Sequence, residues 1–189
     1  VVFQSQAQTK VVGECAITYD IHQIASNGDK SLVGQKQIFI KGNSCKTILK
    51  TPAFTQTLIF NTQQDTAIIL KEIGLNKFLQ YILYASMQPV NLVASKKNGT
   101  ISTILDYPCE TITLSSADGN AMEVTYTTVI IPTVTVYEQA FKEIPGLVMR
   151  YQLTTKEGNK ILYSANKVDL SPITLNVFEV NKSNYQQIN

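Results

Sequence analysis

The sequence is poor in charged residues, contains a single histidine and lacks tryptophan. Lys, Arg, Asp and Glu make up 16% of its 189 residues, whereas a typical soluble domain has roughly 25%. The net charge of +2 is small, and no basic cluster is larger than the Lys96–Lys97 pair, so we expect no nucleic-acid partner. No apolar run approaches the roughly 18 residues of a membrane-spanning helix. We therefore expect a soluble domain and not an integral membrane protein.

The single histidine, His22, limits the catalytic sites that the chain could build. A Cys–His pair would need Cys15, but on a regular strand two side chains seven positions apart point to opposite faces. His22 is therefore interpreted as a solvated surface residue. The chain also lacks the nucleophile-elbow, P-loop, dinucleotide-binding and His-Glu-x-x-His patterns. One histidine gives no plausible zinc set, so we expect no metal, no cofactor and no enzyme.

Two pairs of carboxylates could still act without a histidine. A glycosidase-like hydrolase needs two carboxyl groups about 5–10 Å apart. Glu138 and Glu143 flank a predicted helix, and Asp106 and Glu110 flank the bend at Tyr107–Pro108. Neither pair shows more than ordinary surface placement. A carboxylate-dependent hydrolase is kept as the least favoured hypothesis.

The three cysteines, Cys15, Cys45 and Cys109, cannot all pair within one chain. If hairpin turns flank the strand that contains Ile40, Cys15 and Cys45 lie on opposite sides of Ile40. Two strand spacings, about 9–10 Å, would separate them, which exceeds the Cα separation that a disulfide tolerates. We expect free buried thiols and leave a bridge from Cys109 open.

The first residues, VVFQSQAQ, resemble the end of a signal peptide, with a small-x-small cleavage signal that finishes at Ala7. An ordinary frayed strand is the alternative. The low charge and the many Thr, Asn, Gln and Ser residues are common in exported β proteins. We expect residues 1–7 to be a signal-peptide remnant or a disordered start, residues 8–189 to form a single domain, and the protein to be periplasmic or secreted.

Alternation of apolar and polar residues predicts a series of antiparallel strands. From Cys15 to Ile21, large apolar residues occupy every second position, which is the period of a half-buried strand. Turns near Asn27–Gly28 and Gly42–Asn43 would separate this strand from the next two. An exposed turn is expected at 96–99. Strands are predicted over 14–24, 33–41, 45–51, 55–61, 66–72, 100–105, 109–116, 122–131, 147–155 and 160–170.

Two segments follow the period of an α-helix instead. Between Gly74 and Pro89, five apolar residues recur at offsets 0, 3, 4, 7 and 8, which is one stripe of a helix. A second stripe covers residues 136–144, and Pro145–Gly146 ends it. There Pro removes a backbone donor and Gly permits a positive φ. The five residues of the first stripe are Leu75, Phe78, Leu79, Ile82 and Leu83.

These elements predict a mainly β (α+β) fold built from one sheet. We expect a single strongly curved antiparallel sheet, or unclosed barrel, of about 10–11 strands with two short helices on its concave side. Such a half-barrel can leave a cavity between helices and sheet. The candidate lining residues are Phe78, Leu79, Ile82, Leu83, Phe141, Leu147 and Met149.

Residues 104–151 resemble a group of exported Bacteroidota proteins that includes the GLPGLI family. The resemblance is carried by Tyr107–Cys109, by Val124–Thr128, by Ile130–Pro132 and by Ile144–Val148, with Ile144 where the family motif has Leu. Asp106 stands where the group usually has Gly. That group is similar in strand order to lipoprotein carriers of the LolA/LolB type. The resemblance implies an unclosed barrel with a helical lid over an apolar, acyl-chain-binding cavity.

The leading hypothesis is a non-catalytic binding or carrier protein for a hydrophobic ligand. The ligand would be a lipid or a lipoprotein acyl chain held between the sheet and the helices. The alternative is an envelope structural or interaction protein with a packed core, whose partner binds at exposed strand edges. An apolar cavity would favour the first hypothesis, and a filled interior the second.

Overall fold

The computed structural model describes residues 8–84, 92–116, 121–135, 137–154 and 159–188. Most of these residues belong to one twelve-stranded sheet, in the order β14-β7-β6-β5-β4-β3-β2-β13-β12-β10-β9-β8. Its strands are β2 (Glu14–Ile24), β3 (Lys30–Lys41), β4 (Ser44–Lys50), β5 (Thr55–Asn61), β6 (Thr66–Ile73), β7 (Asn76–Leu83), β8 (Leu92–Ile104), β9 (Tyr107–Ser116), β10 (Ala121–Thr127), β12 (Leu147–Thr154), β13 (Lys160–Asp169) and β14 (Gln186–Gln187).

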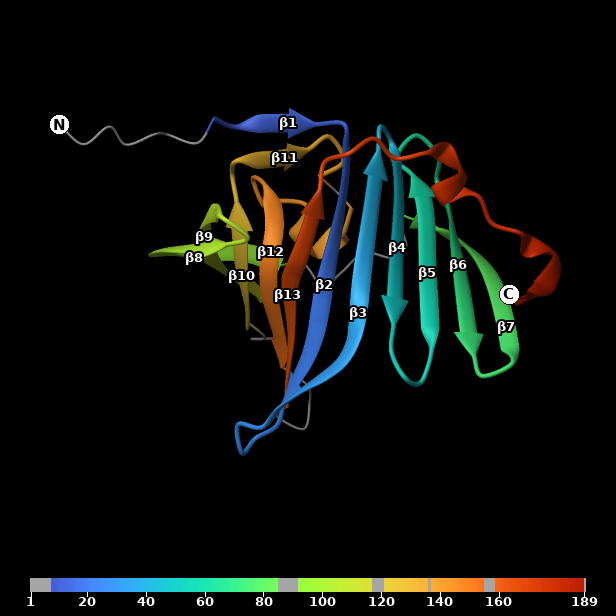
Figure 1. Cartoon of the computed structure of the whole chain (residues 1–189), viewed down its shortest axis with the longest axis horizontal. Coiled ribbons are helices and arrows are strands. Elements are labelled where there is room, and N and C mark those ends of the chain that lie inside the picture. The colour runs from blue at the N-terminus through green and yellow to red at the C-terminus, as the bar shows by residue number, and fades with distance from the viewer. Residues whose placement is uncertain (1–7, 85–91, 117–120, 136, 155–158, 189) are drawn as a thin grey trace.

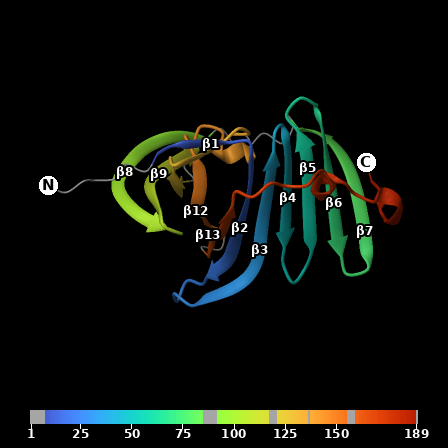
Figure 2. The same cartoon turned by 45° about the horizontal axis from the view of Figure 1, so that its top comes forward.

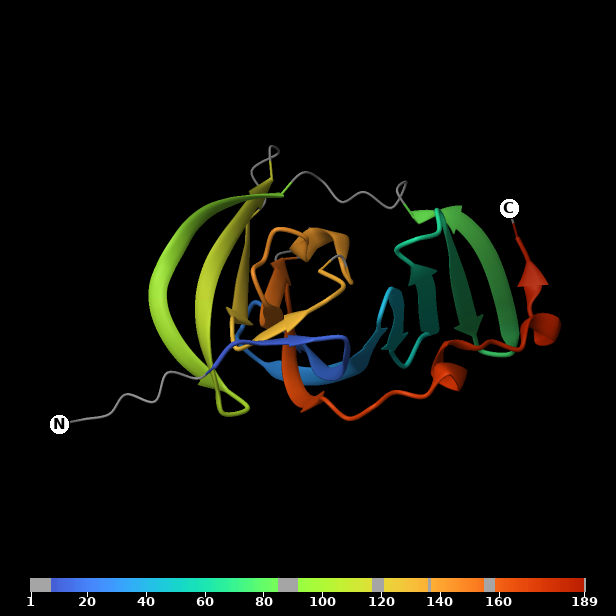
Figure 3. The same ribbon diagram turned by 90° about the horizontal axis from the view of Figure 1, so that it is seen from above.

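The sheet is strongly curved and does not close. Seen from above, it forms a U, with β8 to β10 in one arm and β4 to β7 in the other (Figure 3). Within the described ranges β8 and β14 are the two edges, and no pairing joins them. Neighbouring strands run antiparallel (Figures 1 and 2), except for β14, which pairs parallel with β7. The predicted class, a mainly β fold with one curved, unclosed antiparallel sheet, is confirmed.

The meander from β2 to β6 follows the predicted turns and register. Gly28 and Gly42 both adopt positive φ, 91° and 55°, in the two hairpin turns that flank β3. The register pairs Cys15 with Ile40 and Ile40 with Cys45, as the turn positions require. All three cysteines of the chain are free. The prediction of free buried thiols is therefore confirmed.

The helix predicted between Gly74 and Pro89 is wrong, because residues 76–83 form strand β7. Gly74, with φ of 57°, lies in a tight hairpin turn in which Ile73 of β6 pairs with Asn76 of β7. Apolar residues at adjacent positions, such as Phe78 and Leu79, fit a helical stripe and also supply both faces of a strand. The neighbouring edge of β6 decides between the two, since it offers backbone hydrogen bonds along the whole of β7.

The second predicted helix is reduced to one short turn. Only η2, a 3-10 helix over Gln139–Phe141, is present among the described residues of 136–144. The turn expected at 96–99 is also wrong, because these residues continue β8 with a register irregularity between Lys97 and Ile101. Two further 3-10 helices, η3 (Leu175–Phe178) and η4 (Lys182–Asn184), lie near the C-terminus. In the described residues, no helix has the length and apolar character to cross a membrane.

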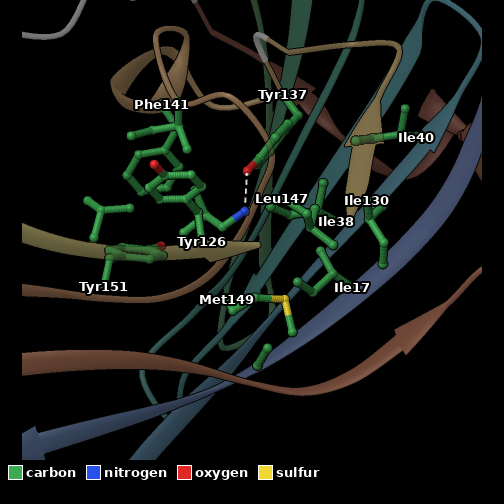
Figure 4. Close-up of a cluster of buried hydrophobic side chains, with 14 of the residues drawn as sticks. Ile17, Ile38, Ile40, Tyr126, Ile130, Tyr137, Phe141, Leu147, Met149 and Tyr151 are labelled. Carbon is green, nitrogen blue, oxygen red and sulfur yellow. Dashed lines mark hydrogen bonds between the residues drawn. The ribbon is translucent and has the colours of Figure 1, made fainter. Parts of the chain in front are cut away.

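The concave side of the sheet is occupied by a segment that we call the inner segment, residues 130–135 and 137–146 (Figure 3). It starts with β11 (Ile130–Pro132), which pairs parallel with β1 (Lys10–Val12). Its buried side chains Phe141 and Ile144 join the main hydrophobic cluster, which Figure 4 shows in close-up. The C-terminal residues instead run outside the U, where Lys46 donates to the carbonyl of Val177 at 2.7 Å.

Candidate ligand-binding cavity

A cavity of about 290 Å³ lies between the inner segment and the concave face of the sheet. Its walls come from β3, β4, β5 and β13 on the sheet side, from the residue that follows β7, and from the inner segment on the other side. The lining is mixed: aliphatic and tyrosine side chains surround a few polar groups. The lining residues are Lys36, Thr47, Leu49, Gln56, Leu58, Tyr84, Tyr137, Glu138, Ala140 and Tyr163.

Strand register explains why the sheet-side residues converge on the cavity. Leu49 of β4 pairs with Lys36 of β3 and with Gln56 of β5. Thr47 pairs with Leu58 in the same way, two positions along β4. Because residues paired across a sheet project to the same face, these five side chains form two adjacent rows on the concave side. Their position follows directly from the pairing of the meander.

Lys36 is a buried cation at the wall of this cavity. Its side chain is 10% exposed. The ammonium donates a hydrogen bond to Glu138 Oε2 of the inner segment and another to the Tyr151 hydroxyl at 3.0 Å. It also lies 5.5 Å from the ring centroid of Tyr151 and 5.6 Å from that of Tyr163, within the range of a cation–π interaction. Lys36 is thus held from several sides.

The aromatic groups around Lys36 form a packed wall. The rings of Tyr151 and Tyr163 stack with centroids 4.4 Å apart, and Phe141 meets Tyr151 edge-on at 4.9 Å. Burial, with the nearby charge of Glu138 as a further cause, raises the pKa of Tyr151 well above its ordinary value. Burial likewise raises the pKa of Tyr163. These phenols therefore stay neutral, and Glu138 is the group whose negative charge faces Lys36.

The two partners of this ion pair differ in their access to water. The Glu138 side chain is 29% exposed, whereas that of Lys36 is 10% exposed. Glu138 lies on the inner segment, immediately before η2, while Lys36 lies in the middle of a paired strand. A carboxylate on a partly exposed segment can return to solvent more readily than a lysine enclosed by the sheet can.

Neither residue was identified as a site residue from the sequence. Lys36 could have been recognised from its position in the alternating strand. It shares a strand face with Ile38 and Ile40, both of which are buried. A lysine at an inward position of an alternating strand indicates a buried charge with a partner. Glu138 was considered with Glu143 as a carboxylate pair of a hydrolase, and ordinary surface placement was favoured for both. Its partner lies 102 residues away in the chain, so no local pattern could indicate the pair.

Four of the predicted lining residues lie on β7, and the strand divides them between two faces. Ile82 pairs with Ala67 of β6 and packs against the main hydrophobic cluster, and Phe78 shares its face. Leu79 and Leu83 project to the other side, where Leu79 pairs with Leu70 outside that cluster. The helical stripe had placed all four on one side.

The remaining three predicted residues, Phe141, Leu147 and Met149, are buried in the main cluster (Figure 4). Leu147 and Met149 are fully enclosed, and Phe141 packs against Tyr151. None of the seven is among the residues that line the cavity. That these residues contact a ligand stays a prediction.

The cysteines and the histidine do not form a reactive group. Burial raises the pKa of Cys15 to about 12 and raises that of Cys45 further, so both thiols stay protonated. His22 pairs with Leu32 and Leu162. It is partly buried and not fully solvated as expected, and its Nδ1 is buried with no hydrogen-bond partner in the described part of the chain. Across the described ranges, no three His, Cys, Asp or Glu residues are grouped as metal ligands.

Comparison with known proteins supports the fold. No protein-family model matches the chain, and no curated protein matches it, so membership in the GLPGLI group stays a prediction. An uncharacterised conserved protein from Thermus thermophilus has a similar structure, with a TM-score of 0.54 and 7% identity over 92% of this chain and 89% of that chain. A LolA superfamily protein from Nitrosomonas europaea aligns with a TM-score of 0.39 and 9% identity over 89% and 90%. The first likeness shows the fold alone, and the second is too low to support an argument.

Proposed function

We propose that this protein is a non-catalytic binding or carrier protein for a hydrophobic ligand, a lipid or an acyl chain. The ligand would lie between the concave sheet and the inner segment. The observation that carries the proposal is the 290 Å³ cavity, whose walls include Leu49, Leu58 and Ala140 beside three tyrosine rings. Ligand sites are typically concave and mostly apolar, with a few placed polar groups, and this cavity has that character.

The alternative, a structural or interaction protein with a packed core, is supported by the inner segment itself. Its side chains Phe141 and Ile144 are almost fully buried, so much of the concave space is filled by protein. The cavity beside them is what distinguishes the two functions. A carboxylate-dependent hydrolase has less support, because Glu138 is the only carboxylate among the described residues that line the cavity, and it is paired with Lys36.

A filled-cavity variant tests the proposal. Ala140 lines the cavity from the inner segment, so Ala140→Trp should occupy the space that a ligand would use. The readout is fluorescence of the neutral apolar probe N-phenyl-1-naphthylamine, which brightens when it leaves water. We expect the wild-type protein to bind the probe and Ala140→Trp to lose binding. Ala53→Trp, in an exposed turn, is the matched control and should bind as the wild type does.

Two results would contradict the carrier function. The first is a wild-type protein that does not bind the probe, and the second is a probe that binds Ala140→Trp and the wild type equally. Native mass spectrometry of protein purified from its own host is an independent check, since a carrier should retain a bound lipid. A protein without adducts that also fails to bind the probe supports the structural alternative.

A periplasmic or secreted location is part of the same proposal. It is supported by the low charge fraction and by the signal-like pattern that ends at Ala7. Fractionation of host cells that produce the full gene product with a C-terminal tag would test it. Recovery of the tagged protein from the cytoplasm alone would count against export.

A further inference from the structure

We infer that the ligand of this cavity is a single-chain amphiphile with a carboxylate head group, which takes the place of the Glu138 carboxylate on Lys36. This inference rests on the proposed function and adds to it the chemical class of the ligand. Three features support it: the Lys36–Glu138 ion pair, the different exposure of its two partners and the size of the cavity.

A ligand in this cavity meets the ion pair between Lys36 and Glu138. Lys36 and Glu138 both line the cavity, so a ligand that enters between the inner segment and β3 meets them. A neutral ligand that pushed Glu138 aside would leave Lys36 as a buried, unpaired cation. Removing one partner of a buried ion pair is strongly unfavourable, because it leaves an uncompensated charge away from water. A ligand that brings its own anion avoids this penalty.

Of the two partners, Glu138 is the one that can be displaced. Lys36 remains held without Glu138, because Tyr151 accepts its hydrogen bond at 3.0 Å and two tyrosine rings lie 5.5 and 5.6 Å from its ammonium. Glu138 has a more exposed side chain and lies on the irregular inner segment. Its carboxylate can therefore turn to water while the ammonium keeps its position. The site selects an anion and not a cation.

The hydrocarbon chain attached to the head group has to fit the rest of the cavity. Besides Lys36, the cavity is lined by Leu49 and Leu58 of the sheet and by Ala140 of the inner segment. Its volume of about 290 Å³ is at the lower limit of the roughly 300–1,000 Å³ typical of ligand pockets. This space suits one hydrocarbon chain better than the two acyl chains of a diacyl phospholipid. Thr47 and Gln56 add neutral polar groups on the sheet side of the cavity.

A competition experiment tests the head group directly. Decanoate, decanol and decylamine carry the same chain with an anionic, a neutral and a cationic head, and each is used to displace N-phenyl-1-naphthylamine from the wild-type protein. We expect decanoate to bind roughly 10- to 100-fold more tightly than decanol, since a hydrogen bond to a charged group contributes about 1.5–3 kcal/mol. Decylamine should be the weakest of the three.

Two variants locate this preference. Lys36→Met keeps an apolar chain of similar length and should abolish the advantage of decanoate over decanol. Lys50→Met, on an exposed position of β4, is the matched control and should leave the advantage unchanged. Glu138→Gln removes the competing carboxylate and should tighten decanoate binding about tenfold. The Glu138→Gln variant keeps the test valid if Lys36→Met does not fold.

The outcomes separate this inference from the proposed function. If the probe binds but decanoate and decanol displace it equally, the carboxylate class is wrong and the carrier function stands. The same conclusion follows if Lys36→Met keeps the preference for decanoate, or if Glu138→Gln weakens decanoate binding. If the probe does not bind the wild-type protein, the carrier function itself fails.

Discussion

The hydroxyl of Tyr19 donates a hydrogen bond to the carbonyl of Val148 at 2.8 Å, across 129 residues of sequence. The amide of Val148 in turn donates to the hydroxyl of Tyr137 at 3.1 Å (Figure 4). Val148 lies beside a register shift between β10 and β12, and the pairing of β12 with β13 begins only at Arg150. Two tyrosine side chains therefore satisfy backbone groups of Val148 at this point, and they tie β2 and the inner segment to the start of β12.

Tyr19→Phe should destabilise the protein by about 1–3 kcal/mol, because the buried carbonyl of Val148 would lose its hydrogen-bond partner. Urea unfolding followed by circular dichroism measures the change in the free energy of unfolding. The control is Tyr81→Phe, which removes a hydroxyl that accepts from Lys182 at the exposed surface. A surface change of this kind should stay within about 0.5 kcal/mol. Equal effects of the two variants would show that the Tyr19 hydroxyl has no special role.

Gly146→Ala should also be destabilising, by about 1–3 kcal/mol, as is typical of overpacking. A Cβ at this position would lie 2.0 Å from the carbonyl oxygen of Thr127, so the start of β12 would have to move. Gly13→Ala is the control, since a Cβ there would meet nothing within 4 Å. Urea unfolding gives the free energy of unfolding of both variants. A Gly146→Ala protein as stable as Gly13→Ala would contradict the close contact between position 146 and the carbonyl of Thr127.

The three thiols should not react with a disulfide reagent in the folded protein. Cys15, Cys45 and Cys109 are each at most 1% exposed, and burial raises the pKa of all three thiols. With 5,5′-dithiobis(2-nitrobenzoate) at pH 8, we expect no rapid colour from the native protein and three equivalents in urea. A native protein that releases even one equivalent within the mixing time would show that a cysteine is accessible.

Stability should fall with rising pH above about pH 9. The pKa of Cys15 rises from 9.0 to about 12 on folding, so between these values the unfolded chain has lost a proton that the folded chain keeps. The free energy of unfolding then decreases by about 1.4 kcal/mol per pH unit for each such thiol. Urea unfolding at pH 8, 9.5 and 10.5 measures how steeply the free energy of unfolding falls with pH. Cys15→Ala should make this slope shallower by the contribution of one thiol, about 1.4 kcal/mol per pH unit. An unchanged slope would contradict the raised pKa.

The positions of Cys15 and Cys45 were predictable from the sequence because they depend only on two nearby hairpin turns and the pairing of adjacent strands. Once Gly28 and Gly42 set the two hairpin turns, strand pairing places Cys15 and Cys45 on either side of Ile40. The failure at β7 has an equally local cause. A run with apolar residues at adjacent positions satisfies the period of a helix and that of a strand, so its conformation is decided by the free edge of β6.

The cavity was predicted as a type of site, but its residues were not. Two short helices over a concave sheet were expected, and the irregular inner segment with η2 takes their place. Lys36 could have been noticed, because it shares a strand face with Ile38 and Ile40. Its partner Glu138 could not be found, because a contact across 102 residues depends on how the inner segment enters the sheet. The two faces of β7 could not be assigned either until its conformation was known.

The amino-acid sequence by itself determined the alternation of most strands, their hairpin turns and the absence of a disulfide between Cys15 and Cys45, since each depends on neighbours along the chain or one strand away. The tertiary structure alone decided which groups meet from distant segments. At Gly146 the sequence suggested a positive φ, whereas its φ is not positive and the carbonyl of Thr127 leaves no space for a side chain. The buried charge of Lys36 likewise acquires its partner only when the inner segment closes over the sheet, because burial and pairing are properties of the packed chain.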